Sequence, residues 1–599
     1  MKKVLPILLI ALILVFALTA CVKNNKTEDE VLPATTISVG TAEDLADIKN
    51  YLGAKYVNYT FTLTDNIDIA SYEQWTPIGT QDKPFCATFD GNGKTISNLT
   101  YIGMKDDGMP SVTEKTPFVG LFGYVKAAKI SNVTLTGVNM RLYSYGEYFH
   151  VAPLAAYSVG ASEFKDINVR GRISLSNIYV YNTTYGLDGK VQDDRVVACD
   201  TTQYVGGLVA YSTGAGVFDN IDAALDISNN NYRAVYEKKT EEVSGETVVT
   251  EGYQVHSYSG ASFLPRQTLA GILAGYIKSG ASLDNITVSG SMEISAKSAY
   301  AASAAAILVG SEAKNITANN TVLVLRGSDK VGGAGSIALL DSSTASDMTV
   351  SNVTLTAQPV GGSIKSVSIG AFVSYCYDLA VLNDNTATDF KVNSSEKDKL
   401  QLGGVVGVVR DATVYGNTVS GTYNVTTGSL RVEAENYNNT SAVVYAAYGN
   451  ATVRDNSADI DITLKNTVVY TEKMTRVYVV VDNTLYVNED GKSVGRFSKP
   501  DNTKDYVEVF VKHENEGEIT AVYNDSEGRE LGQVTFAVNE SAYPADGEAW
   551  QRFFGAYYAE SEGLLAADGT VLNLNGKSFA GFKLVTGTPE LNNNTTVTE

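Results

Sequence analysis

One phrase recurs along most of the chain and constrains its fold more than any other feature. It reads apolar-Gly-x-apolar-x-(Gly or Ala)-Tyr and, after a short polar gap, ends in Asn-apolar-x-apolar. Clear copies begin at Val119, Val205, Ala270 and Leu402, and weaker copies end at Asp166-Ile167, Asn315-Ile316, Asn352-Val353, Asn385-Thr386 and Asn456-Ser457. The recurring Asn positions are mostly roughly 30 to 40 residues apart, which is a period typical of solenoid proteins.

Each repeat carries short apolar runs that alternate with period two and stop at Gly, Asn or Ser, which indicates strands. A single coil of strands cannot bury its own apolar face, whereas stacked coils bury a continuous core. The recurring Asn can adopt turn angles that other residues avoid, and stacked amides can hydrogen bond to one another. We therefore expect an all-β fold, a parallel β-helix, over residues 36–466. The competing β-propeller needs about four strands per repeat, and these repeats carry two or three strand signals.

Segments outside the phrase are expected at both ends of the stack. Thr41 can cap a short amphipathic helix over 41–52 that covers the first coil, and Asp44 follows at the capping-box position. Residues 59–63 then alternate as the first strand. From residue 467 the phrase disappears, and alternating runs predict an antiparallel β region over 467–588, followed by a frayed tail over 589–599. The predicted strands of this region are 477–481, 485–487, 507–511, 519–523 and 534–538.

The repeat spacing jumps twice, between Asp166 and Asn220 and again between Asn220 and Asn285. The additional residues lie near 182–203 and 229–262. The second insertion is charged, and its Ser244-Gly245 pair can turn the chain back. A segment inside the stack would have to continue the apolar period. We therefore expect a projecting hairpin that contributes little to the core and lies where solenoids commonly bind ligands.

The first 20 residues have the three parts of an export signal. Lys2 and Lys3 precede an apolar run over 5–18, which is shorter than the ~20 residues that span a bilayer. Leu18-Thr19-Ala20-Cys21 resembles the lipobox of bacterial lipoproteins, which implies cleavage before Cys21. It also implies a diacylglycerol thioether on Cys21 and an acylated amino terminus, for example with palmitate. An ordinary signal peptide and an uncleaved anchor are the alternatives.

Residues 21–35 are polar and charged, and they predict a disordered tether between the lipid and the fold. We expect the remainder to be extracytoplasmic, at the cell surface, and held to the cell membrane or outer membrane through Cys21. The net charge of −21 would repel nucleic acid and anionic lipid headgroups, so nucleic-acid binding is excluded. The spacing of Cys86, Cys199 and Cys376 fits no metal site or disulfide framework. We expect buried thiols, no metal and no cofactor, although one disulfide stays possible.

Three stretches resemble bacterial surface proteins with GLUG-motif repeats: Trp75-Thr76-Pro77-Ile78-Gly79, the run over 85–99, and Val119-Gly120-Leu121-Phe122-Gly123. The resemblance covers about residues 36–466. It implies a right-handed β-helix on a cell surface and no definite activity, because this repeat is mostly a scaffold. One such group is the IgA-specific zinc metallopeptidases, which need His-Glu-x-x-His. His513-Glu514 begins that motif, but Gly517 occupies the second His position, so we predict no zinc protease.

Other residues could carry chemistry, and each has a simpler interpretation. Asp90-Gly91-Asn92-Gly93 resembles part of a calcium loop but lacks the downstream carboxylates, so a plain turn is expected. Asp378, Asp384 and Arg410 fall in neighbouring repeats and could converge as in glycan-active enzymes, although each also suits a turn. Amphipathic aromatic residues suit protein or sugar surfaces, although strand propensity also enriches them. Such residues crowd one stretch at Tyr143, Tyr145, Tyr148, Tyr179, Tyr181 and Tyr185.

The sequence therefore supports two functional hypotheses. The first is a non-enzymatic surface module for binding, adhesion or structure, with an unknown extracellular protein or glycan as its ligand. The second is a glycan-active β-helix enzyme of the polysaccharide lyase or hydrolase type. Carboxylates gathered in one groove would favour the enzyme, and projecting insertions on a smooth flank would favour the binding module.

Overall fold

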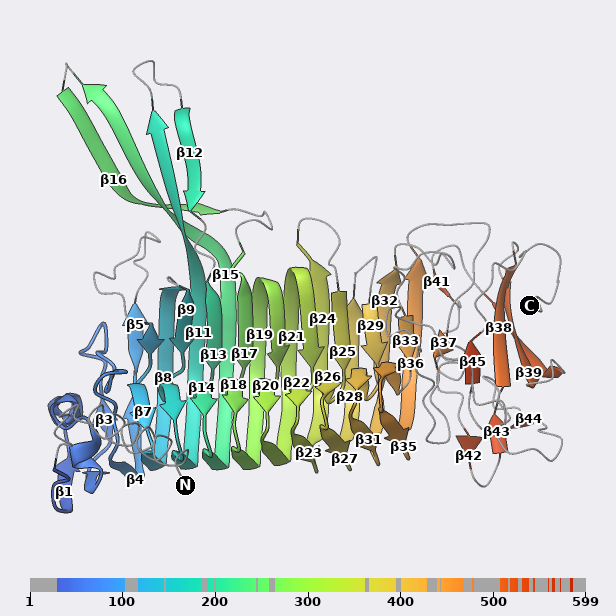
Figure 1. Cartoon of the computed structure of the whole chain (residues 1–599), viewed down its shortest axis with the longest axis horizontal. Helices are drawn as coiled ribbons and strands as arrows, with labels where there is room; N and C mark the ends of the chain where they lie inside the picture. The colour runs from blue at the N-terminus through green and yellow to red at the C-terminus, as the bar shows by residue number, and fades with distance from the viewer. Residues whose placement is uncertain are drawn as a thin grey trace, which may run out of the picture.

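The fold is all-β, with long parallel sheets and almost no helix, and it is β-helix-like (Figure 1). In the computed structural model the described residues are 30–102, 117–144, 147–185, 191–197, 201–243, 246–257, 264–360, 366–394, 400–427, 439–441, 443–466, 477–478 and short strands within 507–584. The export signal, Cys21 and the tail after residue 588 lie outside these ranges. Within them, no helix has the length and apolar character needed to cross a bilayer.

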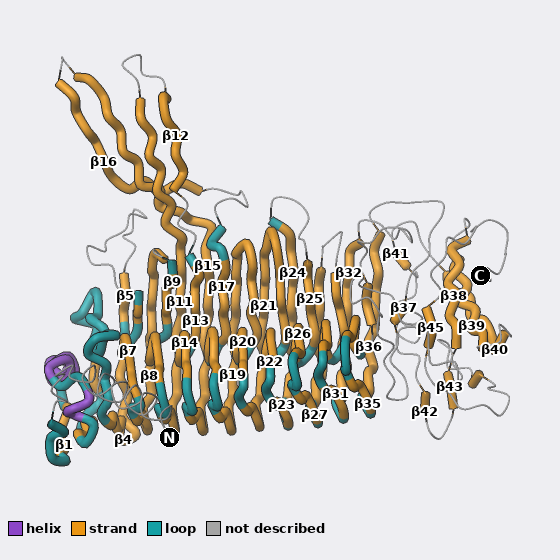
Figure 2. The backbone as a smooth tube through the Cα atoms, viewed as in Figure 1, coloured by secondary structure: helices purple, strands orange, loops and turns teal. Residues whose placement is uncertain are grey.

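Three long parallel ladders of strands run along the repeat region (Figures 1 and 2). The first ladder contains β4 (Thr88–Ser97), β8 (Lys129–Ser144), β11 (Glu163–Tyr185), β15 (Val217–Val243), β19 (Ser282–Ala302), β21 (Glu312–Ala334), β24 (Thr349–Pro359), β28 (Thr386–Ser394), β32 (Thr418–Thr427) and β36 (Ser457–Asn466). The second is a nine-stranded sheet of β7 (Phe122–Lys126), β10 (Ala155–Val159), β14 (Val209–Thr213), β18 (Ala274–Lys278), β20 (Ala305–Val309), β22 (Ile337–Asp341), β26 (Val373–Tyr377), β30 (Val406–Arg410) and β34 (Val444–Tyr448).

The third ladder joins the ends of β19 and β21 to shorter strands. These are β6 (Phe118–Val119), β9 (Tyr148–Val151), β13 (Thr202–Gly206), β17 (Gln267–Gly271), β25 (Ser366–Gly370), β29 (Leu400–Gly403), β33 (Asn439–Ser441) and β37 (Val477–Tyr478). A shorter ladder joins the start of β21 to β23 (Thr344–Ser346), β27 (Val381–Asn383), β31 (Thr413–Tyr415) and β35 (Thr452–Arg454). Cα partners in every ladder are one repeat apart, so equivalent positions form continuous rows. Leu121, Leu208 and Leu273 are fully buried in the core, as their place in the phrase predicts.

The recurring Asn residues lie in one file, as predicted, at equivalent bends within the strands of the first ladder. Left-handed φ angles of 51° to 55°, which Asn and Asp tolerate, occur at Asn132, Asp166, Asn220, Asn285 and Asn315. Asn220 donates to Asp166, and Asn285 Nδ2 donates to Asn220 Oδ1 over 3.1 Å. The chain of amides ends there, because Asn315 Nδ2 donates to Asp284 over 2.8 Å. The file of Asn and Asp residues is therefore continuous, whereas its hydrogen-bond ladder is not.

The predicted helix is shorter than expected and has a different position in the topology. Thr41 and Asp44 form the expected capping box of α2 (Ala42–Asp47), and a 3₁₀ turn (Ile48–Asn50) follows. The prediction that 59–63 is the first strand was wrong, because β1 (Thr35–Val39) pairs in parallel with β2 (Tyr59–Leu63). Parallel neighbours need a crossover connection, and α2 lies in that crossover.

The segment that carries the first motif docks on the start of the nine-stranded sheet. Trp75 is buried, and its Nε1 donates to the Leu121 carbonyl oxygen over 3.1 Å. Ile78 forms a parallel bridge with Phe122. At Gly79, which has a φ of 87°, an added Cβ would lie 2.4 Å from the Tyr124 carbonyl oxygen. The tryptophan and glycine of this motif are therefore packing residues.

Both insertions form hairpins that project from the ladders (Figure 1). The end of β11 pairs antiparallel with β12 (Val191–Val197), and the end of β15 pairs antiparallel with β16 (Glu246–Ser257). The two hairpins also pair with each other, since β11 and β15 continue in parallel register as far as Tyr181 and Glu237. The insertions thus form one four-stranded sheet in the order β12-β11-β15-β16. The spacing of the repeats did not predict that the two hairpins pair with each other.

The C-terminal region contains further strands. β38 (Val507–Glu514), β39 (Glu518–Asp525) and β40 (Glu530–Ala537) pair antiparallel as expected, and β45 (Phe582–Leu584) joins β38 in parallel. β42 (Tyr558–Ala559), β43 (Gly563–Leu565) and β44 (Val571–Leu572) form a second small sheet. Within the predicted strand over 477–481, β37 extends the third parallel ladder. The predicted strand over 485–487 lies outside the described residues.

Candidate functional site

Two rows of aromatic side chains meet on the outside of the core. The tyrosine ladder, Tyr124, Tyr157, Tyr211 and Tyr276, lies on the nine-stranded sheet and is partly exposed. The facing row, Phe118, His150 and Tyr204, lies on the third ladder. Ring centroids of the two rows approach to 5.5 Å for Phe118 and Tyr157, and to 5.2 Å for Tyr204 and Tyr211. The rows form one aromatic surface along several repeats.

The rings of the tyrosine ladder stack on one another. Successive centroids are 4.9, 4.7 and 5.0 Å apart, and the ring planes differ by 8°, 12° and 5°. These distances match the spacing of hydrogen-bonded strands, about 4.8 Å. Burial raises the pKa of Tyr157 and Tyr276, so both stay neutral phenols. Because each face inside the ladder covers another face, its rings present mainly edges and hydroxyl groups.

Farther along, smaller side chains interrupt both rows. On the nine-stranded sheet, Ile307, Leu339, Tyr375 and Val408 continue the register of the ladder. The resulting cavity has a volume of about 490 Å³. We call it the tyrosine pocket, and it is lined by Tyr300, Lys330, Leu339, Ser366, Tyr375, Tyr377, Gln401, Val408, Arg410 and Tyr448.

A glycine allows two walls of the tyrosine pocket to meet. The rings of Tyr300 and Tyr375 lie 6.1 Å apart at 55°, and those of Tyr375 and Tyr377 lie 5.6 Å apart at 51°. A Cβ added at Gly332 would lie 2.6 Å from the Tyr300 ring and 3.1 Å from the Tyr375 ring. These rings are tilted rather than stacked. Tyr375 is only 8% exposed, whereas Tyr300 and Tyr377 are partly exposed and offer aromatic surface to a ligand.

The lining of the tyrosine pocket carries two cations and no carboxylate. Arg410 lies over the Tyr377 ring, 4.4 Å from guanidinium carbon to ring centroid. Its Nη2 donates to both carboxylate oxygens of Asp378, over 3.1 and 3.0 Å. Lys330 is exposed on β21, in register with Ser366 of the next strand. Burial raises the pKa of Tyr377, so its phenol stays neutral beneath the guanidinium.

No protein-family model, curated protein or solved structure matches this chain. The assignment of a site therefore depends on geometry. The described residues also contain no group of three or more His, Cys, Asp or Glu side chains arranged to hold a metal ion.

The predicted cluster of Asp378, Asp384 and Arg410 forms only in part. Asp378 and Arg410 pair, but Asp384 does not line the tyrosine pocket and accepts instead from Asn383 Nδ2 over 2.7 Å. Both aspartates have left-handed φ angles, 51° and 57°, which indicates turn positions. The Asp90 segment is a bulge within β4, where the register with β8 shifts between Asp90 and Lys94, and Asp90 accepts from the Asn92 amide over 2.8 Å.

The tyrosine-rich stretch of the sequence did not predict the position of the tyrosine pocket. Tyr143 is buried, and only Tyr148 lies near the facing row, 6.5 Å from Tyr204 between ring centroids. Tyr145 and the side chains of Tyr179, Tyr181 and Tyr185 lie outside the described residues. The useful signal was the Tyr that closes the repeat phrase at 124, 211 and 276, because parallel register stacks equivalent positions.

Two of the three scattered cysteines are buried free thiols, Cys86 and Cys376. Burial raises the pKa of Cys376 to about 12, and burial also raises that of Cys86. Neither thiol forms a thiolate readily near neutral pH. The Cys199 side chain lies outside the described residues.

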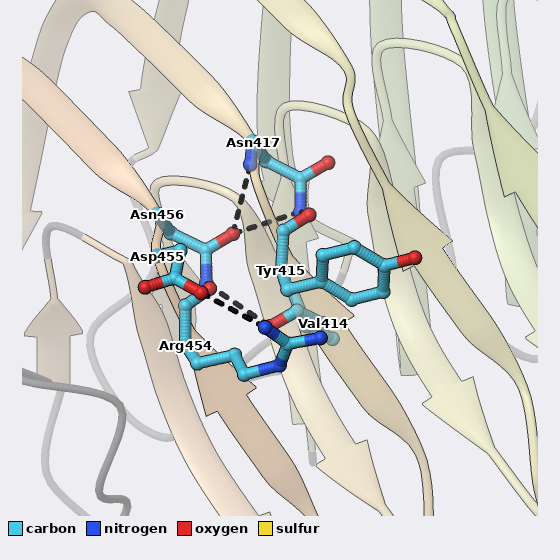
Figure 3. Close-up of polar contacts among 6 residues, drawn as sticks. All are labelled: Val414, Tyr415, Asn417, Arg454, Asp455 and Asn456. Carbon is cyan, nitrogen blue, oxygen red and sulfur yellow. Dashed lines mark hydrogen bonds and ion pairs between the residues drawn. The ribbon is translucent and has the colours of Figure 1, made fainter.

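A second ladder of polar side chains is structural (Figure 3). Asn385 Nδ2 donates to Asn417 Oδ1 over 2.7 Å, and Asn417 Nδ2 donates to Asn456 Oδ1 over 2.8 Å. Beside it, Arg454 lies 4.4 Å from the Tyr415 ring centroid and pairs with Asp455. This arginine repeats the arrangement of Arg410 but does not line the tyrosine pocket.

Proposed function

We propose that this chain is a cell-surface lipoprotein whose GLUG-type repeats form a right-handed parallel β-helix. It acts as a non-enzymatic binding or adhesion module for an extracellular glycan or protein. Lipid on Cys21 holds it to the cell membrane or outer membrane, outside the cytoplasm. Its net charge of −21 argues against nucleic acid as a partner.

The tyrosine pocket is the observation that carries this proposal. Its volume of about 490 Å³ lies in the range of small-ligand sites, roughly 300 to 1,000 Å³. Mostly apolar and aromatic walls with a few polar groups are also typical of such sites. Glycoside hydrolysis generally requires two carboxyl groups beside the scissile bond, and none lines this pocket. A glycan-active enzyme therefore remains the less supported alternative.

The decisive experiment fills the tyrosine pocket at Val408, which is 4% exposed and lies in a small apolar cluster with Tyr375 and Tyr445. Val408 follows Tyr375 in the outer row, so Val408→Tyr would extend the aromatic row into the cavity. We expect a ligand found by screening the purified full chain against glycans and matrix proteins to lose at least tenfold in affinity. Val322→Tyr, at a position that is 47% exposed outside the pocket, controls for the added ring, and an unchanged melting temperature of Val408→Tyr would show that this variant is folded. Equal binding by the wild type and Val408→Tyr would refute this site.

A further inference from the structure

The aromatic groups of the tyrosine pocket differ from the tyrosine ladder in what they offer a ligand. Ladder rings stack within 12° of parallel, so neighbouring tyrosines occupy their inner faces. In the pocket, the planes of Tyr300 and Tyr375 differ by 55°, and small residues separate the large ones along the row. Rings with an uncovered face and a polar tip can contact the apolar face of a ligand while hydrogen bonding at its edge.

The charges of the pocket are unusual for so acidic a chain. The whole chain has a net charge of −21. The charged side chains that line the pocket are Lys330 and Arg410, and no carboxylate lines it. They come from different ladders, Lys330 from β21 and Arg410 from β30. Asp378, outside the lining, pairs with Arg410 and offsets its charge, so Lys330 and the Arg410 donors that this pair leaves open provide the attraction for an anion.

Arg410 is held in place before a ligand arrives. Its stacking on Tyr377 and its pair with Asp378 fix the plane of the guanidinium. That pair uses Nη2, so the donors on Nε and Nη1 are not engaged in it. Arginine donors suit the planar oxygens of a carboxylate. Preorganisation of this kind reduces the entropy lost when a ligand binds.

The neutral polar groups of the pocket suit hydroxyl-rich ligands. Ser366 Oγ donates to Gln401 Oε1 over 3.5 Å, and this contact leaves the amide NH₂ of Gln401 available as a donor. A sugar ring presents an apolar C–H face and a rim of hydroxyl groups, and tyrosine walls with an amide complement both. We propose that the tyrosine pocket binds a carboxylated sugar unit of a glycan. This inference specifies the ligand of the proposed binding function and therefore rests on it.

The test measures binding of four defined saccharides to the full chain by calorimetry in mild detergent. Trigalacturonic acid and 3′-sialyllactose carry carboxylates, and galactotriose and lactose are their neutral counterparts. We expect at least one carboxylated saccharide to bind at least tenfold more tightly than its counterpart, and the two acids distinguish a uronic from a sialic source. Raising the salt concentration should weaken this preference, because exposed charges are screened.

Variants then assign the preference to the pocket. Arg410→Gln and Lys330→Gln should each reduce the preference for the acid, which is the ratio of its affinity to that of the neutral saccharide, at least fivefold. Arg454→Gln is the matched control, because Arg454 also lies 4.4 Å from a tyrosine ring and pairs with an aspartate, but outside the pocket (Figure 3). Unchanged circular dichroism and melting temperature would show that each variant is folded.

Three results would overturn the inference: equal binding of acidic and neutral saccharides, equal loss in Arg454→Gln, or no binding of any of the four. If none binds but another ligand from the screen is lost in Val408→Tyr, the binding function stands and only its ligand class is wrong. If no ligand depends on Val408, both proposals are wrong.

Discussion

At the scale of single residues, the facing row holds a histidine in its neutral form. His150 is buried, 5.1 Å from the Phe118 ring and 4.8 Å from the Tyr204 ring between centroids. Tyr157 and Tyr211 also pack against it, so the rings around it are uncharged. Its Nδ1 has no hydrogen-bond partner in the described structure. Burial lowers the pKa of His150 to about 4.

This histidine should make stability depend on pH. In the unfolded chain a histidine has a pKa of about 6.5, so the unfolded chain binds the proton more readily than the folded chain. The contribution of neutral His150 to the free energy of unfolding is therefore fully present above pH 6.5 and is lost as the pH falls toward 4. The loss approaches about 3 kcal/mol, at 1.36 kcal/mol per unit of pKa. We expect His150→Phe to flatten the decline in melting temperature between pH 7.5 and 4.5.

The control for this prediction is Tyr204→Phe, which keeps the histidine and should keep the slope. Parallel pH profiles for the wild type and His150→Phe would show that other groups cause the acid destabilisation.

At the scale of elements, the buried Asn ladder holds neighbouring turns together. Asn417 is fully buried. Its Nδ2 also donates to the carbonyl oxygens of Leu382 and Tyr415, over 3.2 and 2.9 Å. Its Oδ1 accepts from the Asn385 backbone over 3.2 Å. One amide thus satisfies groups from three successive repeats.

Removing that amide should be costly. Asn417→Ala leaves buried donors and acceptors without partners, at about 1 to 3 kcal/mol for each unsatisfied group. We expect the free energy of unfolding, measured by denaturant titration, to fall by about 2 kcal/mol or more. The matched control is Asn424→Ala, because Asn424 is exposed and donates to Asn393 over 3.3 Å. Equal effects of the two changes would contradict a structural role for burial.

Local features were predictable from the sequence, and contacts between repeats were less so. The phrase predicted strands, inward Leu residues and Asn turns because each depends on a few neighbouring residues. The tyrosine pocket depends on register between distant segments: Gly332 is needed because Tyr300 and Tyr375 meet above it. The sequence placed Asp378, Asp384 and Arg410 in neighbouring repeats, but it did not show that Arg410 pairs with Asp378 alone or that Tyr377 lies beneath the guanidinium.

At the scale of the whole molecule, the projecting sheet is anchored by a buried polar cluster at its base. Gln203 Nε2 donates to Ser144 Oγ over 2.7 Å, and Asn229 Nδ2 donates to Gln203 Oε1 over 2.8 Å. Thr268 Oγ1 donates to the same Gln203 oxygen over 2.9 Å. The hairpin of β15 and β16 leaves the ladders just after Asn229. The polar cluster therefore holds the chain in place where the hairpin begins to project.

Deleting the arm of this hairpin should therefore leave the repeat region intact. Replacing residues 233–256 by a two-residue turn keeps Asn229 and its hydrogen bonds. A doubling of loop length changes closure entropy by only about 0.6 kcal/mol, so we expect the melting temperature to change by a few degrees at most. Circular dichroism and differential scanning calorimetry would measure this. A control that also replaces Asn229 by Leu should lose much more stability, and a similar loss in both variants would show that the arm itself is structural.

The proposed lipid anchor at Cys21 can be tested by removing its thiol. We expect Cys21→Ser to abolish labelling by a palmitate analogue and to move the protein from the detergent phase to the aqueous phase, because the acyl chains supply most of the membrane affinity. Phase partitioning of whole-cell lysates measures this. Cys86→Ser, which removes a buried thiol, is the control and should leave partitioning unchanged. Retention of Cys21→Ser in detergent would indicate an uncleaved anchor.

The constant register of the nine-stranded sheet has an evolutionary consequence. Inner and outer rows run separately, so a substitution such as Leu339 to an aromatic residue would reshape the surface while Leu340 continues to fill the core. Duplication or loss of one repeat would move the pocket along the molecule by one strand spacing, about 4.8 Å. A set of proteins built on this plan could change its specificity by editing one repeat at a time, and the number of repeats would set how far the pocket lies from each end of the ladders.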